Sequence, residues 1–303
     1  MTEISTNPKR WNIGLVGYGE VGRILAEDLR RQDVRVAAYD LKLGNDQAGA
    51  LRDHAARHSV ALAASHAELA AQADFIVSAV TASQAVPVAQ ACAPAVKKGA
   101  WFLDFNSSSP GAKRRAADLI DGNSGRYVEG AVMTSIPPYR IKVPLLLGGK
   151  SAEALAPLLA ELGFDAKVAS EQLGVASAVK MCRSVMIKGL EAMVIESFTT
   201  ARAYGVEDQV LPTLQETFPG IDWSNQGAYF FSRVAQHSQR RAEEMRESAN
   251  TVREAGFEPL MTAAIAAKQQ WVADQAKAGV FSGIGKGARW QEFADRLLGA
   301  RKE

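Results

Sequence analysis

The chain has 303 residues, enough for about two domains. Its hydrophobic fraction of 47% and charged fraction of 22% are typical of a globular protein, and 35 Lys and Arg against 33 Asp and Glu give a net charge of +2. This weak charge argues against partners such as nucleic acid or an anionic membrane. The start of the chain is polar and no apolar run reaches membrane-spanning length, so we expect a cytoplasmic protein.

A glycine-rich turn follows the first predicted strand, at 13–16, and leads into a predicted helix. Its glycines have the spacing G-x-G-x-x-G. In such turns the first glycine permits the tight turn, the second lets the backbone approach a pyrophosphate, and the third lets the helix pack on the strand. The amides at the helix N-terminus then face the phosphates. We therefore predict a dinucleotide site made of Gly17, Tyr18, Gly19, Glu20, Val21 and Gly22.

A second predicted strand, at 34–39, ends in Asp40. This acid lies about twenty residues after the glycines, where a carboxylate binds the ribose 2′-hydroxyl of NAD. Its charge would repel the 2′-phosphate of NADP, so NAD is the predicted cofactor, although the nearby Lys42 leaves NADP open. Val80 and Thr81, at and just after the end of an apolar run at 75–80, are assigned to the same site.

Strands and helices alternate along the first part of the chain. We predict further strands at 60–62, 75–80, 101–104, 127–132 and 145–148, with helices at about 48–58, 67–71, 83–93 and 152–162. Another helix should begin at Pro110 with Ser109 as its N-cap. This alternation predicts an α/β fold, with an N-terminal Rossmann domain over residues 1–168 built on a doubly wound parallel sheet.

The pattern then changes to helix alone. One long helix is predicted from 171 to 203, followed by helices at 211–218, 229–255, 260–278 and 288–298. Gly256 and Gly279 are expected to end two of them. Residues 169–303 are therefore predicted to form an all-helical C-terminal domain.

The long helix carries a row of polar residues at helical spacing, amid apolar ones that include Val179, Cys182, Met186 and Met193. One interpretation is the solvated face of an amphipathic helix. The other is a narrow polar seam on a largely buried helix, which would line a wet cleft. The members of the row are Ser177, Lys180, Ser184, Lys188 and Glu191.

Three segments in order resemble the β-hydroxyacid dehydrogenases and 6-phosphogluconate dehydrogenase, from about residue 11 to 200. The stretch from Gly174 through Lys180 to Ser184 resembles their G-x-x-x-x-x-K-x-x-x-N segment, with serine in place of asparagine. Residues 102–110 resemble the substrate loop D-x-S-T-x-S-P, and residues 127–135 lie where the family has D-A-P-V-S-G-G. The run that begins at Lys180 resembles a bacterial subgroup described as 6-phosphogluconate-dehydrogenase-like.

The resemblance implies an NAD(P)-dependent dehydrogenase that transfers a hydride between nicotinamide and a small hydroxy acid or carbonyl compound. It implies that Lys180 is the general acid/base and that Ser184 completes the catalytic pair. Desolvation and nearby cations lower the pKa of a lysine, which suits this role. The resemblance also implies a carboxylate-bearing substrate and a homodimer. The residues expected to bind substrate are Asn106, Ser107, Ser108, Met133, Thr134, Ser135 and Lys188.

Two other functions stay open. An imine reductase is a related possibility, although such enzymes usually lack the lysine. A nicotinamide-binding protein without turnover is the second, because Ser184 and Met133 depart from the family pattern.

No metal site is expected. His54 and His58 have the i,i+4 spacing of a zinc-binding pair, but no third ligand is apparent and both are expected to be solvated. Cys92 and Cys182 are expected to be buried free thiols, because both lie in apolar surroundings.

Overall fold

The structure is a computed structural model that describes residues 4–45, 48–285 and 287–300. The chain divides into two compact units, Met1–Met181 and Cys182–Glu303. Helix α8 (Val175–Tyr204) begins in the first unit and continues into the second. Each unit is described by itself below.

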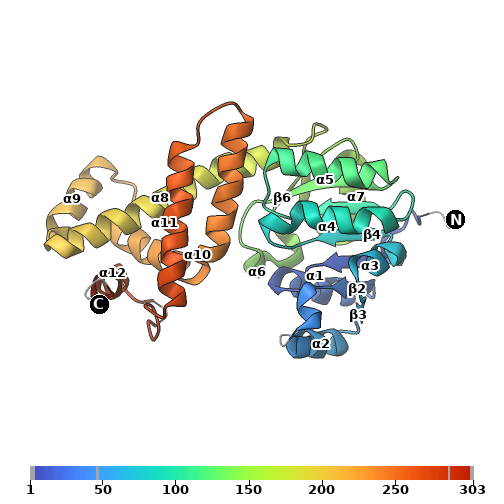
Figure 1. Ribbon diagram of the computed structural model, residues 1–303, viewed down its shortest axis with the longest axis horizontal. Coiled ribbons are helices and arrows are strands. Elements are labelled where there is room, and N and C mark those ends of the chain that lie inside the picture. The colour runs from blue at the N-terminus through green and yellow to red at the C-terminus, as the bar shows by residue number, and fades with distance from the viewer. Residues whose placement is uncertain (1–3, 46–47, 286, 301–303) are drawn as a thin grey trace. The chain divides into compact units, whose positions relative to one another are not determined.

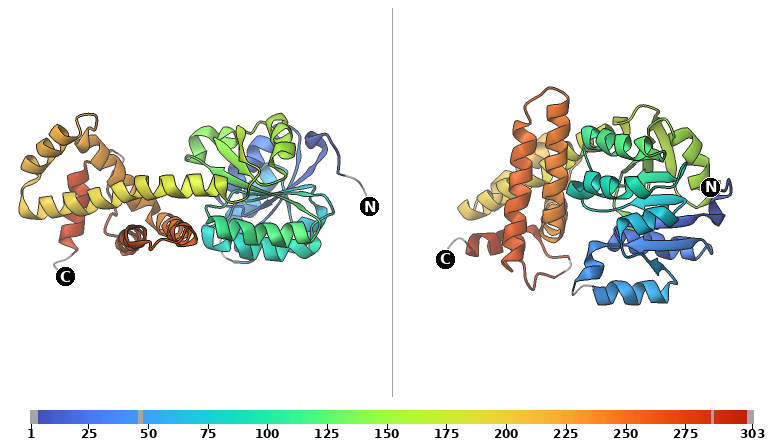
Figure 2. Two further views of the ribbon diagram at one scale, coloured as in Figure 1. Left: turned by 90° about the horizontal axis from the view of Figure 1, so that it is seen from above. Right: turned by 45° about the vertical axis from the view of Figure 1, so that its right-hand side comes forward.

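The first unit is built on an eight-stranded sheet with the order β3-β2-β1-β4-β5-β6-β7-β8 (Figures 1 and 2). The adjacent strands pair in parallel except β6 and β7, which are antiparallel. The strands are β1 (Asn12–Val16), β2 (Arg35–Tyr39), β3 (Ala61–Leu62), β4 (Phe75–Ser78), β5 (Trp101–Asp104), β6 (Arg126–Val132), β7 (Leu145–Gly148) and β8 (Ala166–Ser170).

The predicted α/β fold with a Rossmann-type sheet is confirmed, with two corrections at its far edge. The connection from β6 to β7 contains only a short helix, α6 (Ile136–Tyr139), and one 3-10 turn, Arg140–Lys142. A parallel return needs a helix that crosses the sheet, so this short connection returns antiparallel. Strand β8 was not predicted, because it is a partly exposed edge strand without the apolar run of a buried one.

Helices cover both faces of this sheet (Figure 2). On one face, a core of large aliphatic side chains joins the strands to α1 (Glu20–Arg30), α2 (Ala48–Arg57) and α7 (Ala152–Glu161). On the other, small residues let α3 (His66–Gln72), α4 (Ala85–Cys92) and α5 (Pro110–Gly122) pack closely. Helix α5 begins as predicted, because the Ser109 side chain accepts a hydrogen bond from the backbone N–H of Ala112.

The second unit is helical throughout the part that the structure describes. It contains most of α8 together with α9 (Glu207–Thr217), α10 (Trp223–Glu254), α11 (Leu260–Lys277) and α12 (Trp290–Gly299). Aromatic side chains such as Phe198, Phe231 and Trp290 form its core. Gly256 and Gly279 follow α10 and α11 with φ angles of +86° and +82°, which confirms their predicted roles as helix stops.

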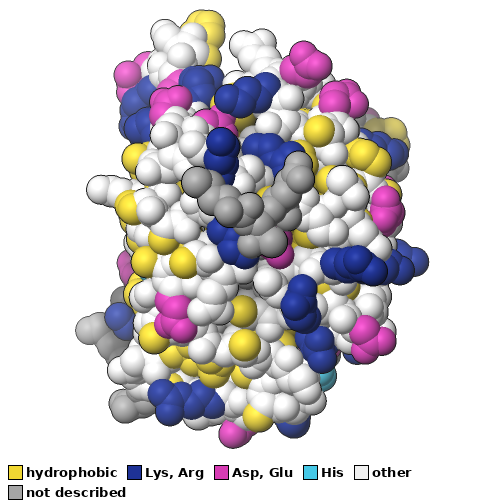
Figure 3. Space-filling view, turned by 90° about the vertical axis from the view of Figure 1, so that its right-hand side faces the viewer, with side chains coloured by type: hydrophobic (Ala, Val, Ile, Leu, Met, Phe, Trp, Pro, Cys, Tyr) yellow, Lys and Arg dark blue, Asp and Glu magenta, His cyan; other side chains and the backbone are white. Residues whose placement is uncertain are grey.

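The surface is mixed in charge. On the face of the molecule shown in Figure 3, Lys and Arg side chains are interspersed with Asp and Glu, in keeping with a net charge of only +2. Among the described helices, none has the length and apolar character needed to span a membrane.

Candidate active site

The glycine-rich turn lies between β1 and α1. Gly17 has a φ of +90°, and a Cβ on it would overlap the carbonyl oxygen of Ala79. A Cβ on Gly22 would overlap the carbonyl oxygen of Gly17, whereas a Cβ on Gly19 would meet nothing within 4 Å. Gly19 is the N-cap of α1 and has no side chain to bond the first amides of the helix. The turn is therefore tight where the helix packs and open where a phosphate would bind.

Asp40 follows β2 and bonds back to the turn. Its Oδ2 accepts a hydrogen bond from the backbone N–H of Tyr18 at 2.7 Å, and its Oδ1 accepts one from the backbone N–H of Lys42 at 2.9 Å. Each carboxylate oxygen has a further lone pair, so Asp40 can hold the turn and still accept from a ribose hydroxyl. The Tyr18 side chain is fully buried, while Glu20 is exposed and Val21 half-buried on the first turn of α1.

Val80 and Thr81 lie beyond the carboxyl end of β4. Strands β1 and β4 are the neighbours at which the strand order reverses, and open α/β sheets bind ligands at this point. A Cβ on Gly17 would come within 2.9 Å of Val80 Cγ1, so Val80 packs on the glycine turn. Its backbone N–H donates to Asn106 Oδ1 at 2.7 Å, which connects the turn to the predicted substrate loop.

The predicted substrate loop follows β5, and its first residues are held by contacts to Asp104, the last residue of that strand. The buried Lys113 lies 3.0 Å from Asp104 Oδ1, and the Tyr127 hydroxyl donates to Asp104 Oδ2 at 2.7 Å. Burial and then the neighbouring Asp104 raise the pKa of Tyr127 well above its usual value, so the phenol stays a donor. The backbone N–H of Asn106 also donates to Asp104, at 2.8 Å. These bonds fix the start of the loop.

Asn106 itself is used within the protein. Its Oδ1 accepts from Val80, its Nδ2 donates to Ser78 Oγ at 2.9 Å, and the residue is 3% exposed. The structure therefore shows Asn106 joining the ends of β4 and β5, which differs from the direct substrate contact implied by the resemblance.

Lys180 lies against the next residue of the loop. Its Nζ donates a hydrogen bond to Ser107 Oγ at 2.6 Å, and both side chains are half-buried. The neighbouring Ser108 is fully buried, and its Oγ has no hydrogen-bond partner among the described residues. A buried hydroxyl without a partner is unusual, so Ser108 has unused capacity for a ligand. The structure thus brings the predicted catalytic lysine, Lys180, next to the predicted substrate loop.

The start of α8 is anchored by a buried carboxylate. Glu129 on β6 is 0% exposed, and its Oε1 accepts from the backbone N–H groups of Gly174 (2.8 Å) and Ala176 (3.2 Å). Its Oε2 accepts from Ser177 Oγ at 2.9 Å. A carboxylate at a helix N-terminus satisfies the open amides and complements the helix dipole. Glu129 therefore fixes the helix turn from which Lys180 extends.

The predicted substrate residues Met133, Thr134 and Ser135 form the turn between β6 and α6. Met133 and Ser135 are half-buried and Thr134 is exposed. The backbone N–H of Met133 donates to the carbonyl of Pro144 at 3.0 Å, which holds the two sides of this turn together.

The rest of the polar row on α8 lies in the second unit. Lys188 Nζ is 2.8 Å from Glu244 Oε2 on α10 and donates to Ser184 Oγ at 3.2 Å; Ser184 and Lys188 are each 7% exposed. Glu191 forms a buried ion pair with Arg241 of α10. Because four of the five members are buried, the solvated-face interpretation is wrong.

The apolar side of α8 differs from expectation as well. Val179, Met186, Ile187 and Met193 are exposed, with Met186 reaching 74%. Cys182 is exposed too, so its predicted burial is wrong, whereas Cys92 is buried and burial raises its pKa to about 12. Met181 and Val194 on the same helix are buried, so the sequence pattern did not determine which apolar side chains pack inward.

Sequence reasoning missed several residues that hold the site. Three charged residues from other elements hold the predicted site residues in place. Lys113 binds Asp104 at the start of the loop, Glu129 binds the start of α8, and Glu244 binds Lys188. The available signal was a charged residue inside an apolar stretch, as for Glu129 within 126–132. Such residues are rarely buried without a partner.

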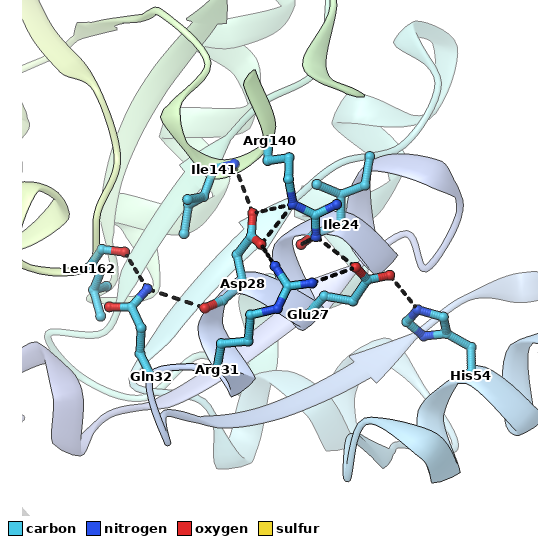
Figure 4. A network of polar contacts seen from close by, with 9 residues as sticks. All are labelled: Ile24, Glu27, Asp28, Arg31, Gln32, His54, Arg140, Ile141 and Leu162. Carbon is cyan, nitrogen blue, oxygen red and sulfur yellow. Dashed lines mark hydrogen bonds and ion pairs between the residues drawn. The ribbon is translucent and has the colours of Figure 1, made fainter. Parts of the chain in front are cut away.

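The two helix histidines also differ from prediction. His54 is 5% exposed and bonds to the Tyr18 hydroxyl at 2.8 Å and to Glu27 on α1 at 3.1 Å. Figure 4 shows how Glu27 and its neighbour Asp28 in turn bind Arg140. The expectation that His54 is solvated is therefore wrong.

Comparison with known proteins identifies the domain that contains the glycine turn. Residues 12–150 match the NAD binding domain of 6-phosphogluconate dehydrogenase, and residues 201–272 match a domain of unknown function. The structure of a conserved hypothetical protein from Sinorhizobium meliloti 1021 is 37% identical, covers 96% of each chain and has a TM-score of 0.74.

Two further relatives point the same way. A conserved protein of unknown function, reported to be structurally similar to 3-hydroxyacid dehydrogenases, is 28% identical over 88% of this chain and 98% of that chain, with a TM-score of 0.67. The mitochondrial 3-hydroxyisobutyrate dehydrogenase of Drosophila melanogaster is 22% identical over 228 residues, 74% of this chain and 68% of that protein. The chain therefore belongs to the β-hydroxyacid dehydrogenase-like superfamily and has its nicotinamide-dinucleotide-binding N-terminal domain.

Proposed function

We propose that this protein is an NAD-dependent oxidoreductase that acts on a small hydroxy acid or the corresponding carbonyl compound, with Lys180 as general acid/base. The observation that carries this proposal is the 2.6 Å hydrogen bond from Lys180 Nζ to Ser107 Oγ. It places the lysine beside the loop that resembles a substrate loop, within one compact unit. Family membership supplies the reaction type.

The fit of the cofactor rests on the glycine turn. The open amides of α1, the space at Gly19 and the carboxylate of Asp40 suit a pyrophosphate and a ribose diol. When bound, the nicotinamide accepts or donates the hydride. We propose NAD over NADP because Asp40 would repel a 2′-phosphate, and the exposed Lys42 is the residue that would weaken this preference.

In the oxidation direction, the neutral amine of Lys180 takes the proton of the substrate hydroxyl. The carbon that bears this hydroxyl gives its hydride to the nicotinamide and becomes the carbonyl carbon. In reduction, the ammonium of Lys180 returns that proton to the oxygen. Ser107 orients the amine through its hydrogen bond, and we assign the unpartnered hydroxyl of Ser108 to a substrate oxygen. General acid–base catalysis of this kind contributes about 10²–10⁴-fold to a rate.

Ser184 can serve in place of the family asparagine. Its hydroxyl oxygen accepts from Lys188, so its own proton is directed elsewhere and can be donated to the reacting oxygen. Lys188 is held by Glu244 and is therefore proposed to act on substrate through Ser184. We assign Met133, Thr134 and Ser135 to the carboxylate of the substrate, and Asn106 to holding the loop.

A homodimer accounts for the exposed apolar side chains of the long helix. Met186, Ile187 and Met193 are 74%, 42% and 54% exposed. Exposed apolar patches of this kind mark interaction surfaces, and a second copy of the chain is the proposed partner. Sedimentation should show a dimer that Met186→Glu converts to monomer; a wild-type monomer at micromolar concentration would contradict this.

The first experiment is a panel of small β-hydroxyacids and aldehydes with NAD(H) and NADP(H), with absorbance of the reduced nicotinamide as the readout. We expect turnover on at least one compound and its loss in Lys180→Ala, while that variant still binds cofactor. Near-normal turnover in Lys180→Ala would end the assignment of the lysine.

The same panel separates the two alternatives. Cyclic imines are included, and turnover on an imine that survives Lys180→Ala would identify an imine reductase. Tight cofactor binding without turnover on any compound would favour a nicotinamide-binding protein. Failure to bind either cofactor would contradict the dinucleotide site itself.

A further inference from the structure

Three potential metal ligands meet where α1 and α2 pack in the nucleotide-binding unit. Glu27 lies on α1, His54 lies on α2, and His58 lies just beyond the end of α2. One ligand atom from each lies within 4.8 Å of the other two. We propose that Glu27, His54 and His58 bind a divalent cation of the zinc class. This site is independent of the proposed activity.

The ligand types and positions suit zinc. Two imidazoles and one carboxylate are a familiar zinc set, which a water completes to four ligands. His54 Nε2 is already 3.1 Å from Glu27 Oε1, and the two imidazole rings have centroids 4.5 Å apart. Ligand atoms around a tetrahedral zinc lie roughly 3.3 Å apart, given bonds of about 2 Å. A small inward rotation of the half-buried His58 would therefore complete the geometry.

Two of the proposed ligands, His54 and Glu27, are held in position by hydrogen bonds from their other polar atoms. Ligating histidines commonly donate their second ring N–H to a neighbour, and ligating carboxylates are themselves hydrogen-bonded. The second nitrogen of His54, Nδ1, is 2.8 Å from the Tyr18 hydroxyl. The second oxygen of Glu27, Oε2, is 2.6 Å from Arg140 Nη2, as Figure 4 shows. Both ligands are thus oriented through their outer atoms, and a cation would replace the 3.1 Å bond between His54 Nε2 and Glu27 Oε1.

The surrounding charges decide which cation binds. The carboxylates of Glu27 and Asp28 are offset by Arg31 and Arg140, and Arg23 is also near. A hard cation such as Mg²⁺ or Ca²⁺ needs several oxygen ligands and would gain little here. Imidazole nitrogen favours Zn²⁺ and its neighbours instead. A cation bound here would link α1 to α2 beside the glycine turn.

The test uses the full-length protein, freed of metal with a chelator and titrated with zinc chloride against a chromophoric competitor. We expect one equivalent of zinc to bind and magnesium chloride not to displace it. His58→Ala removes a half-buried ligand and leaves the Glu27–His54 bond in place, so it should fold and bind zinc at least tenfold more weakly. His237→Ala, on α10 outside the cluster, is the matched control and should bind as wild type does.

Two further readouts guard against weak or indirect effects. Zinc should raise the melting temperature of the wild type and of His237→Ala, and should raise that of His58→Ala by less at the same zinc concentration. Cobalt(II) should give the visible bands of a tetrahedral site in the wild type, and Glu27→Gln should reduce them. Equal zinc uptake by wild type and His58→Ala, or no uptake by the wild type, would overturn the proposal.

Discussion

Two stretches of helix α8 carry one polar row but place it in different surroundings. At the start of the helix, Glu129 holds the backbone and Lys180 reaches the hydroxyl of Ser107. Farther along, Lys188 pairs with Glu244, and Glu191 pairs with Arg241. The first stretch presents a half-buried amine to a loop, whereas the second neutralises its charges inside a helical core.

The same sequence pattern therefore has a proposed catalytic role in the first stretch and a stabilising role in the second. A buried ion pair leaves each charge bound to its partner, and breaking it leaves an uncompensated charge in the core. An amine beside a hydroxyl at a partly open position can exchange a proton with a ligand. We therefore expect variants at Lys180 to affect turnover, and variants in the second stretch to affect stability first.

The largest expected effect is that of Lys180→Arg on turnover. Arginine keeps the positive charge but does not lose its proton near neutral pH, so kcat should fall about 10²–10⁴-fold. The free energy of unfolding should change by less than about 1 kcal/mol, since the side chain is half-buried. Steady-state kinetics on any substrate found in the panel, with urea denaturation alongside, would measure both. A rate within threefold of wild type would remove the distinction between the two stretches.

Arg241→Met should be the most damaging change to stability. It leaves the buried carboxylate of Glu191 unpaired, and we expect the free energy of unfolding to fall by about 3–5 kcal/mol. Urea denaturation followed by circular dichroism measures this loss. The double variant Arg241→Met with Glu191→Leu should recover most of it, because no buried charge remains. A loss that persists in the double variant would show that packing, rather than the ion pair, is what the arginine supplies.

Lys188→Met tests whether the second stretch also serves the reaction. It removes the partner of Glu244 and the donor to Ser184, and should lower the free energy of unfolding by about 1–3 kcal/mol. Through Ser184 it should also lower kcat, but by less than Lys180→Arg does. Ser184→Ala, which removes the hydroxyl and keeps the Lys188–Glu244 pair, is the matched control. Equal kcat in Lys188→Met and wild type would show that Lys188 stabilises the fold but does not contribute to turnover.

The smallest expected effect is that of Glu129→Gln. Glutamine keeps an acceptor for the first amides of α8 but loses the charge, which should cost about 1–2 kcal/mol of unfolding free energy. Because the start of α8 positions Lys180, kcat should fall while cofactor affinity stays constant. Isothermal titration with NAD provides that second measurement. A change in cofactor affinity without a change in kcat would contradict the proposal that Glu129 positions Lys180.

Local motifs made much of the first unit predictable. The glycine turn, Asp40 at the end of β2 and the Ser109 cap each depend on residues close in sequence. The helical domain and its glycine stops follow from periodicity and from φ angles that favour glycine. The direction of β7 and the existence of β8 were not predicted, because the first depends on which strand β7 pairs with and the second is a partly exposed edge strand without an apolar run.

The sequence by itself determined the dinucleotide turn, the alternation of strands and helices up to β7, and the lysine and serine motifs of the candidate site. These features are set by steric and periodic rules that act within one turn or one strand. Only the tertiary structure decided which partner each buried charge meets. Glu129 reaches Gly174, Glu191 reaches Arg241, and Glu27 reaches His54, and none of these pairs is close in the sequence. Burial makes those partners necessary, but packing alone selects them.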